Sequence, residues 1–150
     1  MESGQFEQTC RSLGLEPVFL EVATPGEIDG AMAQLARQRV QAVVLRGDTF
    51  LYDRAFEITA AAIKHGLPTM GETPAIAREA GALASYSATG AEEGRKGASY
   101  IDRILRGAKP ADLPVEQATR FELVINLKTA RALGITIPQV LLLRADEVIQ

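Results

Sequence analysis

Residues 41–70, QAVVLRGDTFLYDRAFEITAAAIKHGLPTM, carry the alternation of patterns that decides the fold. The continuous apolar run at 41–45 is typical of a strand that is covered on both faces, and it ends before Gly47. Apolar residues then recur at helical spacing over 51–65, and a second short strand is expected over 67–70. A strand, a helix and a strand in this order predict a βα unit of a parallel sheet.

The same alternation continues on both sides of this unit. We expect helices over 3–13, 25–39, 74–80 and 90–106, and strands over 17–22 and 82–86. Thr24 and Glu27 have the spacing of a capping box at the start of the second helix. The pattern predicts an α/β fold, a three-layer Rossmann-like or flavodoxin-like parallel sheet, with one lobe formed by residues 1–107.

A boundary is expected at Gly107–Pro114, because a glycine and two prolines interrupt any helix or central strand there. Beyond it we expect a strand over 121–125, a helix over 127–133, and short helical segments over 138–143 and 145–149. Residues 108–150 are therefore interpreted as a linker and a returning strand–helix tail, packed on the same lobe or at a dimer interface.

Composition excludes several classes of protein. The 150 residues are 47% hydrophobic with a net charge of −3, which fits one compact domain and argues against nucleic acid as a partner. One cysteine and one histidine cannot form an internal disulfide or a Cys/His zinc cluster. The longest apolar stretches fall short of the ~20 residues that span a bilayer. Residues 1–5 lack the features of a signal peptide, so we expect none in this chain.

Polar residues follow three of the expected strands. Asp48 and Thr49, Glu72 and Thr73, and Tyr86 and Ser87 occupy these positions. Ligands of open parallel sheets bind outside the carboxyl ends of the strands, where two carboxylates could receive an ammonium group or donor hydroxyls. The alternative is that Asp48 and Glu72 simply cap the helices that follow them.

Other reactive residues favour structural roles. His65 stands at a helix end, where a cation suits the helix dipole, and Cys10 lies on the apolar face of the first helix. No glycine-rich phosphate motif or nucleophile elbow follows a strand. The loop at 88–94 could direct backbone N–H groups at an anion, but its two glutamates would repel a phosphate. We therefore expect no catalytic residues, no cofactor and no metal.

The stretch YIDRILRGAKPADLPVEQ at residues 100–117 resembles the signature of one family, and the pattern continues through 121–134 and 144–149. That family is the ABC-transporter substrate-binding proteins of the TrpX-like group, which have the type I periplasmic-binding-protein fold. The resemblance implies two Rossmann-like lobes joined by hinge strands, with a small ligand caught between them. This chain resembles the C-terminal half, one lobe of such a protein, and Asn126 would lie in a segment that packs towards the other lobe or the hinge.

The resemblance also places a ligand site. Asp48, Thr49 and Phe50 match the family segment after one strand, and Gly71, Glu72 and Thr73 follow the next strand. Tyr86 matches the tyrosine of a family motif, and Ser87 stands where that motif usually has glycine. The implied ligand is an amino acid or a related small carboxylate. The implied partner is an ABC permease, and the implied location is periplasmic or membrane-associated.

Three classes of function remain. The first is the non-enzymatic solute-binding component of an ABC uptake transporter. The second is a truncated, non-binding lobe that acts as a structural or dimerising domain, because a missing lobe should leave apolar surface exposed for a homodimer. The third is an enzyme on a flavodoxin-like sheet, since fold does not fix function. The lack of a catalytic motif and the resemblance to the family signature favour the first class.

Overall fold

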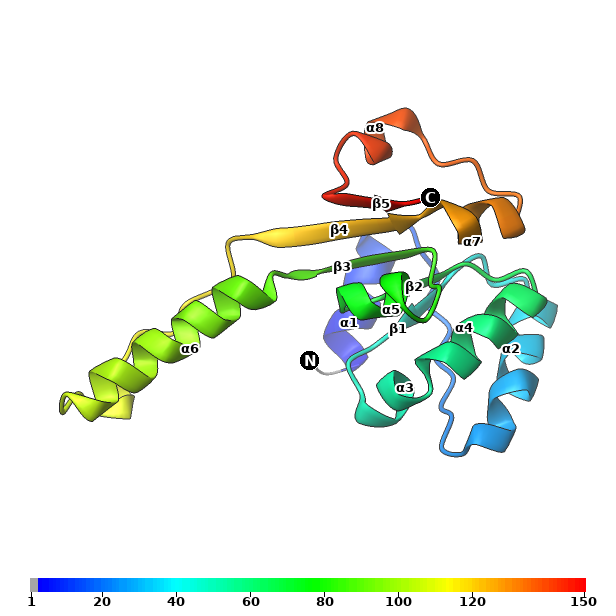
Figure 1. Ribbon diagram of the computed structural model, residues 1–150. Coiled ribbons are helices and arrows are strands. Elements are labelled where there is room, and N and C mark those ends of the chain that lie inside the picture. The colour runs from blue at the N-terminus through cyan, green and yellow to red at the C-terminus, as the bar shows by residue number, and fades with distance from the viewer. Residues whose placement is uncertain (1–2) are drawn as a thin grey trace.

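The computed structural model describes residues 3–150 and contains one five-stranded sheet in the order β1-β2-β3-β4-β5 (Figure 1). The strands are β1 Val43–Leu45, β2 Thr69–Gly71, β3 Ala84–Ala88, β4 Phe121–Asn126 and β5 Glu147–Ile149. The pairs β1–β2, β2–β3 and β4–β5 are parallel. These features confirm the predicted α/β fold with a mostly parallel sheet.

Helices connect the strands. They are α1 Ser3–Ser12, η1 Pro25–Glu27, α2 Ile28–Arg37, α3 Thr49–Asp53, α4 Ala55–Lys64, α5 Pro74–Arg78, α6 Gly90–Leu105, η2 Pro110–Asp112, α7 Leu127–Ala132 and α8 Gln139–Leu142. The helix expected over 51–65 is divided at Arg54 into α3 and α4. The capping box is present, and the N–H groups of Ala23 and Thr24 donate to the Glu27 carboxylate. Among residues 3–150, no helix is long and apolar enough to cross a bilayer.

The core lies between one face of the sheet and helices α2, α4 and α5. Met32 and Leu35 of α2 and Ile58 of α4 are buried there, together with Leu45 of β1 and Ile76 of α5. Burying a side chain of this size contributes about 1.5–3 kcal/mol, so the apolar stripes of these helices hold them on the sheet.

The opposite face of the sheet is less covered. Side chains alternate between the faces along a strand, so Val44, Met70 and Tyr86 share the face away from α5. All three are exposed. Helices therefore cover the α5 face of β1, β2 and β3 more fully than the opposite face.

The sheet departs from the predicted parallel arrangement at one strand, β4, which runs antiparallel to β3. The cause is the path of the chain between them. It leaves the end of β3 through α6 and returns at the same end, where the Thr89 N–H donates to the Arg120 carbonyl at 3.1 Å. A strand that starts where its neighbour stops has to run in the opposite direction.

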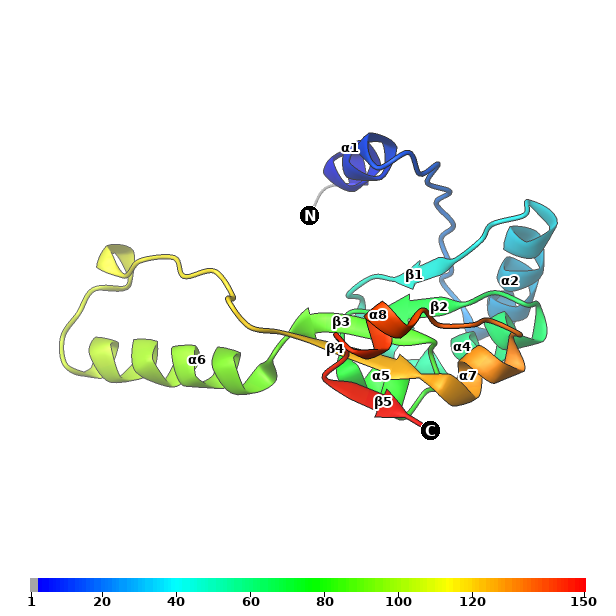
Figure 2. The same ribbon diagram turned by 90° about the horizontal axis from the view of Figure 1, so that it is seen from above.

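Helix α6 extends away from the body as an arm (Figures 1 and 2). The buried carboxylate of Glu92 closes its base: it pairs with Lys96 at 2.9 Å and accepts hydrogen bonds from the Thr119 hydroxyl and the Arg120 N–H, both at 2.8 Å. These contacts, first of all the one with Lys96, lower the pKa of Glu92 to about 2. One carboxylate therefore joins the first turn of the arm to the segment that returns from it.

The strand expected over 17–22 is not formed. Leu20 and Val22 pack against the core at the spacing of two that an extended segment gives, while Val18 and Phe19 are exposed. Among residues 3–150, no strand pairs with this segment. An apolar alternation predicts an extended chain, but a strand also needs a neighbour for its backbone groups.

The helical segment expected over 145–149 is also wrong, because residues 147–149 form β5. Asp146 fixes this end of the chain to β4: its N–H donates to the Leu123 carbonyl at 2.9 Å, and its Oδ2 accepts from the Leu123 N–H at 2.8 Å. The short helix expected within 138–143 is confirmed as α8.

Asn126, expected to pack towards another lobe or a hinge, is buried within this one. Its Oδ1 accepts from the N–H groups of Lys128 and Thr129 at 3.0 and 3.2 Å and so caps α7. Its Nδ2 donates to the Ala77 carbonyl of α5 at 3.1 Å. The residue therefore joins β4, α5 and α7.

The low pKa of Glu92 predicts an acid-sensitive arm. A carboxyl whose pKa is lowered by folding contributes stability above its ordinary pKa of 4.5, and this contribution is lost as pH falls towards 2. We expect the unfolding temperature of the wild-type chain to fall more steeply between pH 5 and pH 2 than that of Glu92→Gln. Glu93→Gln, an exposed neighbour in the same turn, is the control. Parallel curves for the wild type and Glu92→Gln would contradict the assignment.

Candidate functional site

The carboxyl ends of β1 and β2 lie level with one another and beside Ser85 of β3, which continues to Ala88. Leu45 pairs with Gly71, and Gly71 pairs with Ser85. The next residue along each strand therefore comes to one edge, which places Glu72 between Arg46 and Tyr86. This is the edge at which the sequence predicts a ligand site.

Glu72 reaches across to the neighbouring strand end. Its Oε2 accepts a hydrogen bond from the Gly47 N–H at 2.9 Å, and its side chain is exposed. Helix α5 begins after it, with Thr73 as the N-cap residue and Pro74 in the first turn. Helix capping therefore does not explain Glu72. The carboxylate instead bridges the loops that follow β1 and β2.

Tyr52 completes this cluster, and the sequence analysis missed it. A Cβ added to Gly47 would lie 2.9 Å from Glu72 Oε2 and 3.3 Å from the Tyr52 hydroxyl oxygen, so both groups converge on the space that Gly47 leaves open. Burial and the nearby charge of Glu72 raise the pKa of Tyr52. Its hydroxyl thus keeps its proton and can donate. The sequence signal is the position of Tyr52 four residues after Asp48, one helical turn away.

Asp48 has the structural role that the sequence analysis left open. It is the N-cap of α3, and its Oδ1 accepts from the Leu51 N–H at 3.2 Å. The side chain is exposed at the same edge as Glu72, next to Gly47. Thr49 and Phe50 form the first turn of α3, with Thr49 exposed and Phe50 half-buried.

Gly71 serves the packing of α5. Its Cα is buried under Ile76, and a Cβ at this position would lie 2.7 Å from Ile76 Cδ1 and Cγ2. Only glycine lets α5 approach the sheet this closely. By allowing this close packing, the predicted site residue Gly71 sets the position of its neighbours Glu72 and Thr73.

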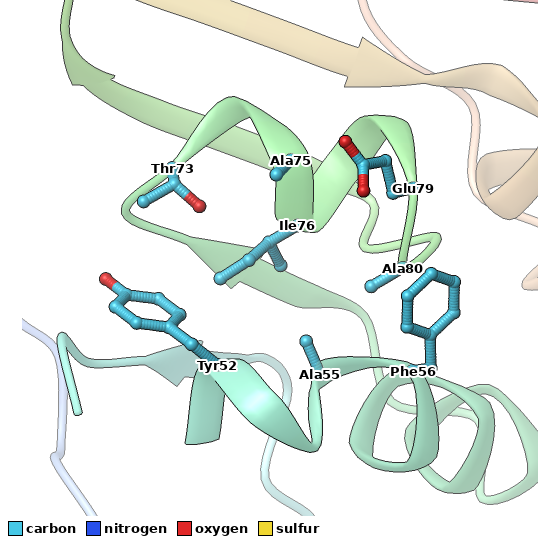
Figure 3. A pocket seen from close by; sticks show the side chains of 8 residues that line it. All are labelled: Tyr52, Ala55, Phe56, Thr73, Ala75, Ile76, Glu79 and Ala80. Carbon is cyan, nitrogen blue, oxygen red and sulfur yellow. The ribbon is translucent and has the colours of Figure 1, made fainter. Parts of the chain in front are cut away.

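A small cavity of about 120 Å³ opens between α4 and α5 (Figure 3). Its lining residues are Tyr52, Ala55, Phe56, Thr73, Ala75, Ile76, Glu79 and Ala80. Figure 3 shows Tyr52 and Thr73 together at one end and Phe56 and Ala80 at the other. Of the predicted site residues only Thr73 lines it, so the cavity adjoins the strand-end cluster through Tyr52 and Thr73.

Tyr86 and Ser87 point to opposite faces of β3. Tyr86 is 49% exposed, and its ring stacks on Phe121 of β4, with ring centroids 5.3 Å apart and planes at 13°. The Ser87 hydroxyl is buried and has no hydrogen-bond partner among the described residues. Tyr86 is thus level with Glu72 and available from solvent, whereas the Ser87 hydroxyl is turned away from solvent.

His65 has structural contacts. Its Nε2 lies 3.1 Å from Asp29 Oδ1, and the same carboxylate oxygen pairs with Lys64 Nζ at 2.8 Å. These contacts link the end of α4 to α2, far along the helix from the strand-end cluster.

Comparison with known proteins identifies one family over almost the whole chain. Residues 4–149 match the family described as ABC transporter substrate binding protein. A search of curated proteins found no match. A solved ABC domain from Streptococcus pneumonia, in complex with L-Trp, is similar at 29% identity and a TM-score of 0.84, over 97% of this chain and 49% of that one.

Two further solved structures agree in fold. A conserved domain protein from Vibrio cholerae is similar at 26% identity and a TM-score of 0.86, over 97% of this chain and 48% of that chain. A ligand-free, open substrate-binding protein with adhesive properties from Clostridium difficile shares the fold at 18% identity and a TM-score of 0.73, over 98% and 48% of the two chains. The chain spans about half the length of these proteins.

The close approach at Gly71 predicts a packing defect on substitution. Gly71→Ala should lower the free energy of unfolding by about 1–3 kcal/mol, because the new methyl group overlaps Ile76. In the Ile76→Ala background the overlapping Cδ1 and Cγ2 are gone, so the added cost should be smaller, as a double-mutant cycle in urea would measure. Equal costs in the two backgrounds would contradict the contact.

The cap at Asp48 predicts a graded effect. Asp48→Ala should cost about 1 kcal/mol of stability, and Asp48→Asn, which keeps an acceptor oxygen, should cost less. Urea unfolding of both variants measures this difference. Identical losses would show that the hydrogen bond to Leu51 is not what Asp48 contributes.

Proposed function

Because this chain belongs to the family of ABC transporter substrate-binding proteins, we propose that it binds a small amino-acid-like ligand at the carboxyl edge of its sheet. The observation that carries this proposal is the exposed Glu72 carboxylate, fixed at the edge by the Gly47 N–H beside Tyr52. A carboxylate that uses one oxygen in this way keeps acceptor sites for an ammonium group. The L-Trp bound to the similar protein from Streptococcus pneumonia supports an amino acid as the ligand.

The other predicted site residues surround Glu72 in this proposal. Asp48, Thr49 and Phe50 supply the loop after β1, Gly71 and Thr73 flank Glu72, and Tyr86 and Ser87 supply the end of β3. Tyr86 offers an exposed aromatic surface level with Glu72. Asp48 adds a second carboxylate at the same edge, in addition to its role as a cap.

In this proposal the edge binds the ligand and a second half closes over it. The solved relatives are about twice as long as this chain, so half of each of them has no counterpart here. We infer that the ligand is closed in between this edge and such a second half, and that the assembly delivers it to an ABC permease outside the cytoplasm. The protein then acts by binding and release, without catalysis.

A second candidate function is a structural lobe that associates with another polypeptide and binds no ligand. The exposed apolar side chains of the α6 arm favour it, because Ile101 and Leu105 are 60% and 82% exposed. Contiguous apolar surface of this kind marks interaction sites. Ligand titration separates the two candidates.

L-Tryptophan is a direct optical probe for this chain. The chain contains no tryptophan, so fluorescence excited where tyrosine does not absorb comes from the ligand alone. We expect the emission of L-Trp to shift on titration with the wild-type chain. Glu72→Gln should weaken binding about tenfold or more, because a charged partner of the ammonium group is lost.

Glu116→Gln is the matched control, since it removes the same charge from an exposed position on the returning segment. The other amino acids are tested by competition and by calorimetry. Equal affinity of Glu72→Gln and the wild type would remove Glu72 from the site. No binding of any amino acid would favour the structural candidate for this chain.

A further inference from the structure

Tyr52 brings a hydrogen-bond donor to the cluster around Glu72. Its backbone N–H donates to the Asp48 carbonyl at 3.0 Å, so it lies one helical turn into α3. Its ring packs against the buried core of the lobe, and Figure 3 shows its hydroxyl directed away from Ala55 and the interior of the cavity. The packing of the ring therefore holds the hydroxyl in place before a ligand arrives.

Gly47 leaves an open space between this hydroxyl and the Glu72 carboxylate. A Cβ at Gly47 would lie 2.9 Å from Glu72 Oε2 and 3.3 Å from the Tyr52 hydroxyl oxygen, so one small ligand can reach both oxygens. Glu72 Oε2 already accepts from the Gly47 N–H. Within the described part of the chain, residues 3–150, the Tyr52 hydroxyl has no hydrogen-bond partner. Its proton is therefore available to a ligand.

The two groups favour opposite charges. Burial and the nearby charge of Glu72 raise the pKa of Tyr52, so its hydroxyl keeps its proton and donates, most strongly to an anion. The Glu72 carboxylate only accepts, and it attracts a cation. Glu72 would repel an anion that came alone, and a lone cation would leave the Tyr52 proton to water. A ligand that carries both charges satisfies both groups.

An α-amino acid carries its two charges at the required spacing. Its nitrogen and its carboxyl carbon are joined through one atom and lie about 2.5 Å apart. Charge-assisted hydrogen bonds of about 2.7–2.9 Å on each side then reach two protein groups that flank one point. Resting on the proposed binding function, we propose that Tyr52 is a specificity residue, whose hydroxyl donates to the ligand carboxylate while Glu72 binds the ligand ammonium group. The site then selects free α-amino acids over amines and over acids that lack the amine.

Arg46 is the competing candidate for the ligand carboxylate, because it follows β1 at the same edge. Its guanidinium carbon lies 5.6 Å from the centroid of the Phe6 ring, a cation–π contact with α1. This contact directs Arg46 to α1, whereas the Tyr52 hydroxyl converges with Glu72 at Gly47. The geometry therefore favours Tyr52.

Three indole ligands separate the two contacts. L-Tryptophan carries both charges, tryptamine lacks the carboxylate, and indole-3-propionate lacks the amine. Each reports its own binding by fluorescence, because the chain contains no tryptophan. We expect the wild-type chain to bind L-tryptophan about tenfold or more tightly than either analogue. Tyr52→Phe should weaken the binding of L-tryptophan about tenfold and leave that of tryptamine unchanged, whereas Glu72→Gln should weaken both.

Tyr100→Phe is the matched control, since it removes the same hydroxyl from the arm, where it donates to the Pro114 carbonyl. It should change neither affinity. Tyr52→Phe keeps the ring that packs on the core, and thermal unfolding of each variant shows whether it is folded. Equal weakening of L-tryptophan and tryptamine by Tyr52→Phe would show that Tyr52 only positions Glu72, and would overturn the proposal. An unchanged affinity for L-tryptophan, or a preference over tryptamine that Arg46→Gln alone removes, would also overturn it.

This inference and the proposed function fail in different ways. If the wild-type chain binds L-tryptophan and Tyr52→Phe does not change its preference over tryptamine, only the role of Tyr52 is lost. If competition and calorimetry detect no binding of any amino acid, the proposed function fails and the inference fails with it. If another amino acid binds more tightly, that amino acid and the amine that lacks its carboxylate replace the indole pair in calorimetry, with the same expected outcomes.

Discussion

The close packing of α5 on Gly71 is the contact on which both the fold and the site depend. Ile76 occupies the space of the missing Cβ and lies directly on the sheet. This contact sets the distance between α5 and the sheet, and with it the position of the turn that carries Glu72 and Thr73. The same helix reaches the returning part of the chain, because the Ala77 carbonyl accepts from Asn126 of β4. One glycine thus allows a five-residue helix to join both halves of the sheet.

Arg78 at the end of α5 extends this connection. Its guanidinium pairs with Glu122 of β4 and with Glu147 of β5, and the hydrogen bond to Glu147 in particular raises the pKa of Arg78. The planar fork of arginine suits two carboxylates at once. Because β4 and β5 lie beyond the arm in the chain, these contacts tie both strands to α5, and β4 lies beside Tyr86 of β3.

The sequence predicts what depends on local pattern and misses what depends on partners. Residues 41–70 contain their own alternation, so the strand–helix–strand unit is predicted correctly. The direction of β4 depends on where the arm returns, and periodicity does not encode it. Residues 17–22 have the pattern of a strand but no neighbour to pair with. Tyr52 was missed because its contact with the Glu72 region depends on the absence of a side chain at Gly47, which only the folded chain reveals.

The candidate site and the arm share one structural element, the end of β3. Tyr86 stacks on Phe121, and two residues beyond Ser87 the chain enters the base of α6, where Thr89 binds Arg120. A ligand held at Tyr86 and a partner held on α6 would therefore act on the same pair of strands. Thermodynamic linkage then imposes a condition: by whatever factor the ligand changes the affinity for a partner on α6, that partner must change the affinity for the ligand. The base of the arm, closed by Glu92, is the place where such coupling would have to pass.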